Sequence, residues 1–303
     1  MNQPFSFTNF DTCDNFAKEE TIMKAKEEKE KVGEIEAEER QKSLIREYFE
    51  SLVETLIIAL FGMTFVVQAV TVPTGSMQNT ILIGDYLLVN KFIFPPGGNP
   101  VPFFPQREIR RGDIIVFKYP GNKINPYPDI ARGIVPYQVN YVKRVIALPG
   151  ETVEFRDNNV YINGELLPEH RIIADPPRSF GDDGEMSALR IKSEEPRLPE
   201  HKWDVYYSSE SMEAVKNGTY KVDPRMNFGV PGKIIKVPED SYFVLGDSRD
   251  QSEDSRFWGF VHRDLIVGQA MFVYWSCDKT AAGDSFLGCL LHPRLDRIGK
   301  VIK

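Results

Sequence analysis

A run of apolar residues from Leu52 to Val72 constrains this chain more than any other feature of its sequence. The run, LVETLIIALFGMTFVVQAVTV, has no charged residue after Glu54, and Gln68 lies near its far end. About 20 helical residues, each rising ~1.5 Å, cross the ~30 Å hydrocarbon layer of a membrane. We predict a transmembrane anchor over residues 52–72, with a buried core helix as the alternative. A cleaved signal peptide is disfavoured because 51 residues precede the run.

Basic residues near this run indicate which of its ends faces the cytoplasm. Arg40, Lys42 and Arg46 come shortly before it, whereas Lys91 is the only Lys or Arg in the 20 residues that follow. Lys and Arg accumulate in the cytoplasmic flanks of membrane spans. We therefore expect a single-pass protein with a cytoplasmic N-terminus and with residues 73–303 on the other side of the membrane.

The segment before the anchor, residues 1–51, is rich in Glu and Lys. Pairs such as Glu20–Lys24 and Glu27–Lys31 have the i,i+4 spacing that supports an exposed helix. Its apolar residues follow no sustained heptad. We predict a charged, mostly helical cytoplasmic segment, with a partner-binding coiled coil as the alternative.

Beyond the anchor the pattern predicts a mainly β fold built from antiparallel sheets. Short runs rich in Val, Ile, Tyr and Phe are bounded by Gly, Pro and Asn, which is typical of strands. No amphipathic segments of helical length separate these runs, so a parallel α/β sheet is disfavoured. Residues 165–235 are polar and Pro-rich, and they are expected to form a loop-rich excursion. FRDNNVYING predicts a hairpin, and the strand candidates are 85–94, 112–120, 141–150, 152–164, 240–247 and 270–276.

Charge and composition exclude some classes of function. The net charge is −7, and residues 1–54 carry 8 basic and 14 acidic side chains, so the chain has no basic surface of the kind that binds nucleic acid. The four histidines show no metal-ligand spacing. We expect no metal and no cofactor.

Three cysteines are present, and their spacing leaves their state open. Cys277 and Cys289 lie 12 residues apart on the expected outer side of the membrane, where oxidation is allowed. A disulfide and two unpaired thiols are both compatible with this spacing. Cys13 is expected to be reduced and exposed.

Four stretches carry the candidate chemistry. Taken alone, Ser76 would be an ordinary turn residue, and Lys143 an ordinary strand lysine pointing to water. Together, in this order and behind an apolar anchor, the stretches resemble the bacterial type I signal peptidases, which are serine/lysine proteases. The resemblance covers about residues 50–155 and 235–303. It rests on VPTGSMQNT (72–80), RRGDIIVFKYP (110–120), YVKRVIALPGE (141–151) and GDSRDQSEDSRFWGFV (246–261).

The resemblance implies a role for individual residues. Ser76 would be the nucleophile and Lys143 the general base, and Thr74 with the Ser76 backbone N–H would form the oxyanion hole. Ser252 matches a serine that orients the lysine. The other positions implied are a bracing ion pair, Asp254 and Arg256, and a substrate pocket lined by Val72, Met77, Ile81, Tyr141 and Val142.

The resemblance also implies an activity and a location. The chain would be a membrane-bound endopeptidase that removes N-terminal signal peptides after a small-x-small site, through an acyl-enzyme. Its partners would be secretory preproteins, the lipid bilayer and the protein export translocon, with no nucleic acid, at the bacterial inner membrane with the catalytic domain outside. Residues 73–155 and 235–303 would form the antiparallel catalytic β domain, and 156–234 a smaller inserted β and loop region. Asn79 and Ser248 depart from the family pattern, which usually has proline and asparagine there.

Lys143 can act as a base only when it is neutral. A free lysine has a pKa near ~10.4, and burial lowers it by up to ~3–5 units. Tyr141, Val142, Val145 and Ile146 supply an apolar setting, so we expect a pKa of about 7–8, in the range that suits a general base.

Two other functions are compatible with parts of the sequence. A self-cleaving serine/lysine protease of the repressor type would need a DNA-binding head, which the anchor and the acidic N-terminus disfavour. A membrane-anchored β domain without catalysis is the second alternative. The aromatic residues Phe92–Phe94 and Phe103–Phe104 fit equally well a surface that dips into lipid and ordinary core packing.

Overall fold

The protein is described by a computed structural model. It describes residues 46–95, 103, 105–156, 158–176, 188–283 and 285–303, together with positions 23, 26, 29–31 and 44. The chain divides into two compact units, Met1–Gly62 and Met63–Lys303. Cys13 and most of the predicted charged helix over 1–51 lie outside the described residues, although the described positions before residue 46 are helical.

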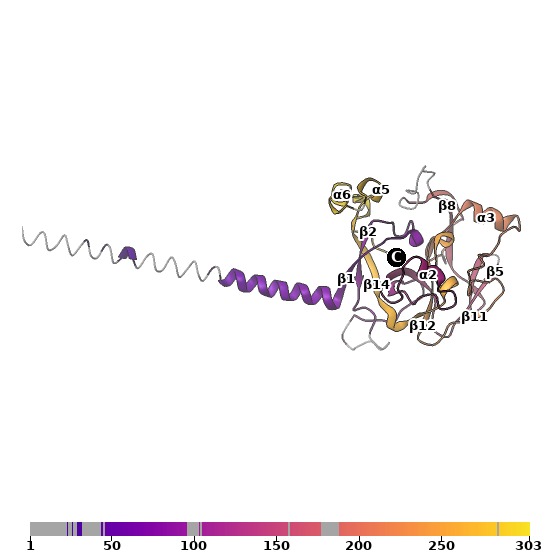
Figure 1. Cartoon of the computed structure of the whole chain (residues 1–303), viewed down its shortest axis with the longest axis horizontal. Coiled ribbons are helices and arrows are strands. Elements are labelled where there is room, and N and C mark those ends of the chain that lie inside the picture. Colours follow the sequence, from indigo (N-terminus) through magenta and orange to yellow (C-terminus); the bar gives the residue numbers. More distant parts are fainter. Residues whose placement is uncertain are drawn as a thin grey trace, which may run out of the picture. The chain divides into compact units, whose positions relative to one another are not determined.

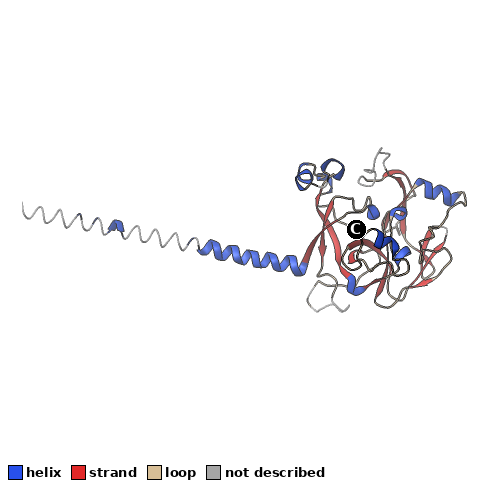
Figure 2. Cartoon of the chain, in the orientation of Figure 1, coloured by secondary structure: helices blue, strands red, loops and turns tan. Residues whose placement is uncertain are grey.

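Among the described residues, the helix Arg46–Val66 is long and apolar enough to cross a membrane, and its apolar stretch is not buried (Figure 2). The prediction of an anchor reaching residue 72 is wrong at its C-terminal end, because Val67–Thr71 form strand β1 instead. Val67, Val70 and Thr71 are β-branched, and β2 offers them a strand edge with which to pair.

The largest sheet of the second unit has seven strands in the order β1-β2-β14-β3-β4-β12-β13 (Figure 1). Every strand pair described in it is antiparallel, so the predicted mainly antiparallel β fold is confirmed. The strands are Val67–Thr71, Asp85–Asn90, Ile266–Ser276, Ile114–Lys118, Asn140–Ala147, Ser241–Leu245 and Val261–His262 in that order.

This sheet is covered on both faces, which explains its continuous apolar runs. Along β3, Ile115 and Phe117 enter one core cluster, whereas Ile114 and Val116 enter another. Successive side chains of a strand point to opposite faces, so apolar neighbours in the sequence fill two cores. A polar side chain in the middle of such a sheet is therefore kept from water on either face.

Two smaller sheets complete the β structure. The order β11-β5-β6-β7 joins Ile235–Lys236, Thr152–Arg156, Asn159–Ile162 and Glu165–Leu166, and the order β10-β8-β9 joins Trp203–Tyr207, Glu169–Asp175 and Arg190–Glu194. The predicted hairpin is confirmed, since Arg156 of β5 lies opposite Asn159 of β6.

The expectation of a loop-rich excursion over 165–235 is wrong in its central part. That interval holds β7 to β10 and the helix α3, Ser209–Lys216, and its strands β8 and β10 pair in parallel. Trp203, Val205 and Tyr207 of β10 are buried in the same core cluster as Ile146 and Phe243 of the large sheet. The strands that form this cluster are far apart in the sequence. The apolar residues of β10 stand among polar residues, so the sequence pattern did not reveal that they belong to the core.

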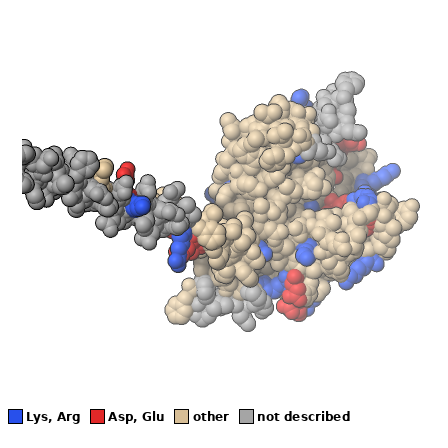
Figure 3. Space-filling view, turned by 60° about the vertical axis from the view of Figure 1, so that its left-hand side comes forward, with Lys and Arg blue, Asp and Glu red and all other residues tan. Residues whose placement is uncertain are grey.

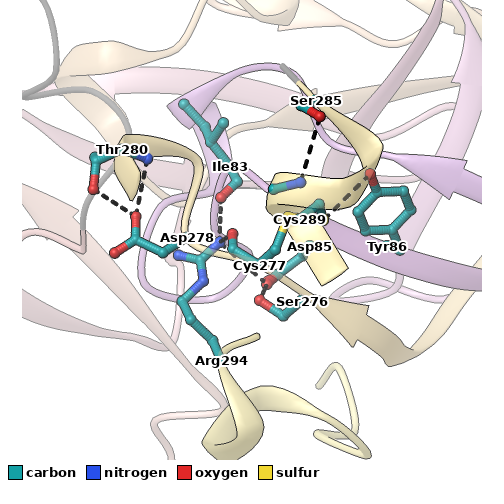
Figure 4. The surroundings of a disulfide bond; sticks show 11 residues. Ile83, Asp85, Tyr86, Ser276, Cys277, Asp278, Thr280, Ser285, Cys289 and Arg294 are labelled. Atoms are coloured by element: carbon teal, nitrogen blue, oxygen red, sulfur yellow. Dashed lines mark hydrogen bonds and ion pairs between the residues drawn. A yellow bond between two sulfur atoms is a disulfide. The ribbon is translucent and has the colours of Figure 1, made fainter. Parts of the chain in front are cut away.

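Short helical segments connect the strands and end the chain. Cys277 and Cys289 form a disulfide bond, which decides between the two states that the spacing left open (Figure 4). The segments are η2 Gly75–Met77, α2 Tyr127–Ala131, η5 Arg249–Gln251, α4 Ser255–Trp258, η6 Arg263–Leu265, α5 Lys279–Ala282, α6 Phe286–Leu291 and η7 Leu295–Arg297.

Candidate active site

The serine singled out by the sequence lies on a short helical turn that follows β1. Ser76 is the middle residue of η2, Thr74 caps that turn with extended backbone, and Ser76 is buried. The turn ends where the Ile81 N–H donates to the Met77 carbonyl at 2.7 Å. The nucleophile candidate is thus held by regular backbone hydrogen bonds between β1 and β2.

Asn79, two residues beyond this turn, departs from the family pattern for a reason that the structure explains. Its φ is +67°, whereas proline fixes φ near −65°. Its side-chain amide accepts from the Leu189 N–H at 2.8 Å and donates to the Leu189 carbonyl at 3.2 Å. Asn79 therefore ties the serine-bearing segment to the chain just before β9.

Lys143 lies on β4, between β3 and β12, where it is 3 % exposed. Ile115 of β3 lies opposite it, and its Nζ is 5.4 Å from the centre of the Tyr141 ring. The ammonium donates to Ser76 Oγ at 2.5 Å. The fold thus brings together two side chains that are 67 residues apart in the chain.

Burial lowers the pKa of Lys143 to about 8, although the negative charges of Asp254 and Asp247 act in the opposite direction. Desolvation disfavours the ammonium because a charge in an apolar setting loses its hydration. A lysine with this pKa exists partly as a neutral amine near neutral pH.

The loop that follows β12 packs against the backbone of Ser76. A side chain on Gly246 would meet the Ser76 carbonyl at 2.4 Å and the Ser252 hydroxyl at 2.2 Å, so only glycine allows this approach. The Ser248 N–H donates to the Ser76 carbonyl at 3.1 Å. The contact uses the backbone of residue 248, which explains why a serine can stand where the family has asparagine.

Ser252 lies in the loop that packs against Ser76, and it makes no hydrogen bond to the lysine. Its hydroxyl is buried and has no hydrogen-bond partner among the residues that the structure describes. The orienting hydrogen bond between Ser252 and Lys143 that the resemblance implies is not formed in this structure.

Asp254 and Arg256 form a buried ion pair. Arg256 donates to the two carboxylate oxygens at 2.8 and 2.9 Å, and the Gly246 N–H donates to the same carboxylate at 3.0 Å. Burial acts to raise the pKa of Asp254, but Arg256 and these hydrogen bonds outweigh it and hold the pKa below its usual value. The ion pair fixes the loop that contacts Ser76.

Two further buried ion pairs flank the site, and the sequence did not single them out. Arg144 pairs with Asp247 at 2.6 Å, and Asp247 also accepts from the Thr80 hydroxyl at 2.7 Å. Arg249 pairs with Glu169 of β8, which links the inserted strands to the same loop. The partners lie 103 and 80 residues apart, so nothing local in the sequence marks them.

A cleft of about 260 Å³ opens beside Ser76 and Lys143. Arg132, Gln251 and Glu253 were not anticipated there, and Arg132 donates to Glu253 at 2.7 Å across the exposed side. The residues that line the cleft are Thr74, Gly75, Ser76, Arg132, Tyr141, Lys143, Gln251 and Glu253.

The five residues expected to line a substrate pocket are divided between two places. Tyr141 lines the cleft. Val72, Met77 and Ile81 are buried in a core cluster, and Val142 packs against that cluster. Within the described residues, no group of three His, Cys, Asp or Glu side chains is arranged to hold a metal ion.

A family model described as signal peptidase, peptidase S26, matches residues 45–275 of the chain. The chain belongs to the signal peptidase family. The match spans the apolar helix, both catalytic candidates and the loop after β12, so the resemblance stated from the motifs is confirmed. The peptidase is a serine endopeptidase of the signal peptidase I type, which removes signal peptides from preproteins.

Individual relatives agree with this assignment. The chain is 32 % identical over 278 residues to signal peptidase I of Aquifex aeolicus, covering 84 % of this chain and 98 % of the relative. It is 30 % identical to signal peptidase I of Pseudomonas aeruginosa, covering 77 % and 73 %. Signal peptidase I of Rickettsia typhi is 32 % identical, with 78 % and 82 % covered.

Proposed function

We propose that Ser76 is the nucleophile and Lys143 the general base for cleavage of the signal peptide bond. The observation that carries this proposal is the 2.5 Å contact between Lys143 Nζ and Ser76 Oγ in a site where the pKa of Lys143 falls to about 8. With that pKa, roughly a tenth of the lysine is neutral at pH 7, against roughly one part in 2,500 for a free lysine with a pKa of ~10.4.

The reaction follows from this geometry. The neutral amine accepts the proton of Ser76 Oγ as the oxygen attacks the scissile carbonyl, and the resulting ammonium then protonates the departing amine. Water, deprotonated by the same lysine, hydrolyses the acyl-enzyme and releases Ser76. One base serves both halves of the reaction because its pKa lies close to the operating pH.

The tetrahedral oxyanion needs donors aimed at it. The first amides of a helical turn have no acceptor inside the turn, and Ser76 is the second residue of η2. Thr74 lines the same cleft. We assign the Ser76 N–H and the Thr74 hydroxyl to the oxyanion hole, where losing one donor typically costs ~10²–10³ in rate.

Ser252, Asp254 and Arg256 act as positioning residues in this proposal. Asp254 and Arg256 hold the loop against Ser76, and the buried hydroxyl of Ser252, which lies near Asp254, would orient the lysine once a substrate is bound.

The proposed cleavage site is small-x-small. Signal peptides carry small residues at the end of their apolar segment, and a cleft of about 260 Å³ lies below the usual ~300–1,000 Å³ of ligand pockets. Val72, Met77, Ile81 and Val142 would support its apolar wall from the core beneath, and Tyr141 would line it directly.

We further propose the arrangement around the membrane. The helix Arg46–Val66 would anchor the chain in the bacterial inner membrane, with the N-terminus in the cytoplasm and the catalytic domain outside. Ser76 follows the end of this helix by ten residues, which suits a substrate held in the bilayer and delivered by the export translocon. The split into a catalytic part, 73–155 with 235–303, and an inserted part, 156–234, belongs to the same proposal.

The deciding experiment compares the full chain with its Ser76→Ala variant on a preprotein in detergent. The variant should fold normally and leave the preprotein uncut, while Ser193→Ala, an exposed serine on β9, should cleave at the wild-type rate. Processing by the Ser76→Ala variant at an unchanged rate would refute the assignment of the nucleophile.

A further inference from the structure

Asn79 connects the segment that carries Ser76 to the inserted region through its side chain. Its φ of +67° lies in the left-handed region, which Asn and Gly adopt more readily than other residues. Its carboxamide accepts from the Leu189 N–H at 2.8 Å and donates to the Leu189 carbonyl at 3.2 Å. One side chain thus satisfies both backbone polar groups of a residue 110 positions away. We call these two hydrogen bonds the Asn79 clasp.

Leu189, the residue that the clasp holds, is itself fixed in the inserted region. Its side chain is buried, and β9 begins at the next residue. It packs in one apolar cluster with Ile172, Ala174 and Tyr206, which belong to β8 and β10. The clasp therefore joins the serine-bearing segment to the three-stranded sheet β10-β8-β9, and not to an isolated loop.

The same sheet also holds the loop that packs against the backbone of Ser76. The Tyr206 N–H of β10 donates to the Asp247 carbonyl at 2.8 Å. Glu169 of β8 pairs with Arg249 of that loop. Both charged partners are buried, so they are not among the charged side chains scattered over the face of the β unit in Figure 3. Two segments that position the serine thus rest on one sheet, although that sheet contributes no residue to the cleft.

The chain between the clasp and the serine is short and hydrogen-bonded. Two backbone hydrogen bonds, of 2.9 and 2.7 Å, close the stretch 75–81 into consecutive turns. Thr80, the neighbour of Asn79, donates its hydroxyl to Asp247 at 2.7 Å. A displacement of Asn79 is therefore transmitted to Ser76, because no flexible linker lies between them.

We propose that Asn79 is a positioning residue for the cleavage reaction, which sets the place of Ser76 Oγ relative to Lys143 by tying it to the inserted sheet. The inference rests on the assignment of Ser76 as the nucleophile in the proposed function. A nucleophile must lie within hydrogen-bond reach of its base, and a misplacement of ~1 Å costs about 10²-fold in rate. The clasp therefore supports kcat although Asn79 does not line the cleft.

The first test compares two left-handed asparagines in the full chain in detergent. Asn79→Gly keeps the backbone conformation and removes the clasp. Asn163→Gly is the matched control, because Asn163 has a φ of +52° and its side chain accepts from the Thr152 N–H at 2.9 Å, in the turn between β6 and β7. Denaturant unfolding should show similar losses of stability in both variants.

Activity on a soluble peptide, measured where both variants are fully folded, separates positioning from stability. Asn79→Gly should lower kcat about tenfold. Its KM and the midpoint of its pH profile should stay at the parent values, because the clasp contacts neither the cleft nor Lys143. Asn163→Gly should keep the parent kcat. Equal falls of kcat in the two glycine variants would overturn the proposal, because the effect would then belong to stability.

The second test keeps the size of the side chain. Asn79→Asp can accept from the Leu189 N–H but cannot donate to its carbonyl, so kcat should fall here too. The parent kcat in either Asn79 variant would contradict the proposal. Failure of the nucleophile assignment would instead appear as activity in Ser76→Ala, so the two outcomes are distinguishable.

Discussion

The site around Lys143 and the exposed helix α6, Phe286–Leu291, both reverse the usual distribution of side chains, and they do so in opposite directions. Lys143, Asp247 and Asp254 are charged groups placed in the core, whereas Phe286 and Leu291 are apolar groups placed in water. Charged residues are rarely buried without a partner, and apolar patches are rarely left open. Each reversal costs stability, so each needs support from its surroundings.

The two regions obtain that support differently. At the site, desolvation lowers the pKa of Lys143 so that part of it is neutral near neutral pH, and the carboxylates around it are matched by Arg144 and Arg256. At α6, the disulfide between Cys277 and Cys289 lies in a small apolar cluster that holds the helix. The comparison teaches that a buried polar site depends on many coupled neighbours, whereas an exposed apolar helix depends on a few local contacts, here a disulfide and a small apolar cluster.

The largest effect is expected from changing the buried amine itself. Lys143→Arg keeps the length and charge but cannot become neutral, because the pKa of arginine exceeds 12. A general base contributes ~10²–10⁴ to the rate, so kcat/KM for a preprotein in detergent should fall by about that factor. Lys118→Arg, exposed at the end of β3, is the control. Retention of most of the activity by Lys143→Arg would exclude this lysine as the base.

The next effect concerns the coupled neighbours of the site. Asp254→Asn leaves Arg256 buried without a counter-charge, which typically costs about 3–5 kcal/mol of stability. Denaturant unfolding of the full chain in detergent measures it. Asp223→Asn breaks the exposed pair with Arg225 and should cost less than about 1 kcal/mol. Equal losses in the two variants would show that burial of the ion pair is unimportant.

The dependence on pH comes third. Because the pKa of Lys143 is lowered to about 8, protonation of the amine should lower kcat/KM about tenfold per pH unit well below that value. The stability should change in the same direction. Between about 8 and the unfolded value near ~10.4, the unfolded chain binds one more proton than the folded chain, so stability rises with pH there. Lys143→Met should lack this rise, and a rate profile that is flat between pH 6 and 8 would contradict the proposal.

Much of this architecture follows from local patterns, and the rest depends on contacts that local patterns cannot contain. The strands and the hairpin of β5 and β6 were accessible because short apolar runs bounded by turn residues mark them in the sequence. The pairing of Ser76 with Lys143 was accessible from the order of the motifs. The anchor was placed six residues too far, at 72 and not at Val66, because the composition of an apolar strand resembles that of a membrane helix.

The charged residues at the rim of the cleft were not predicted from the sequence, for a different reason. Arg132 and Glu253 lie 121 residues apart, and each is an ordinary surface charge in its own segment. The same holds for Glu169, whose partner Arg249 is on the loop that contacts Ser76. These charges come into contact only in the folded protein, so no local sequence motif could have predicted the ion pairs.

The smallest predicted effect tests whether Arg132 and Glu253, at the rim of the cleft, change the pKa of Lys143. Burial lowers the pKa of Lys143, and Asp254, Asp247 and Glu253 each act to raise it, with Glu253 the weakest of the three. Glu253→Gln should therefore move the midpoint of the rate profile to lower pH, whereas Arg132→Gln should move it to higher pH, because the charge of Glu253 then loses its partner. Glu253 is 36 % exposed, so each shift should be a few tenths of a unit and should shrink in high salt.

The control for this pair is Glu200→Gln, an exposed carboxylate in the inserted region. Shifts of the same sign in Glu253→Gln and Arg132→Gln, or an equal shift in the control, would show that the rim does not act on the lysine through charge. Midpoint shifts of opposite sign that both disappear in high salt would show that the charges at the mouth of the cleft act on Lys143 together with the buried ion pairs. Helix α6, held by a disulfide and a small apolar cluster, offers no counterpart to such graded control.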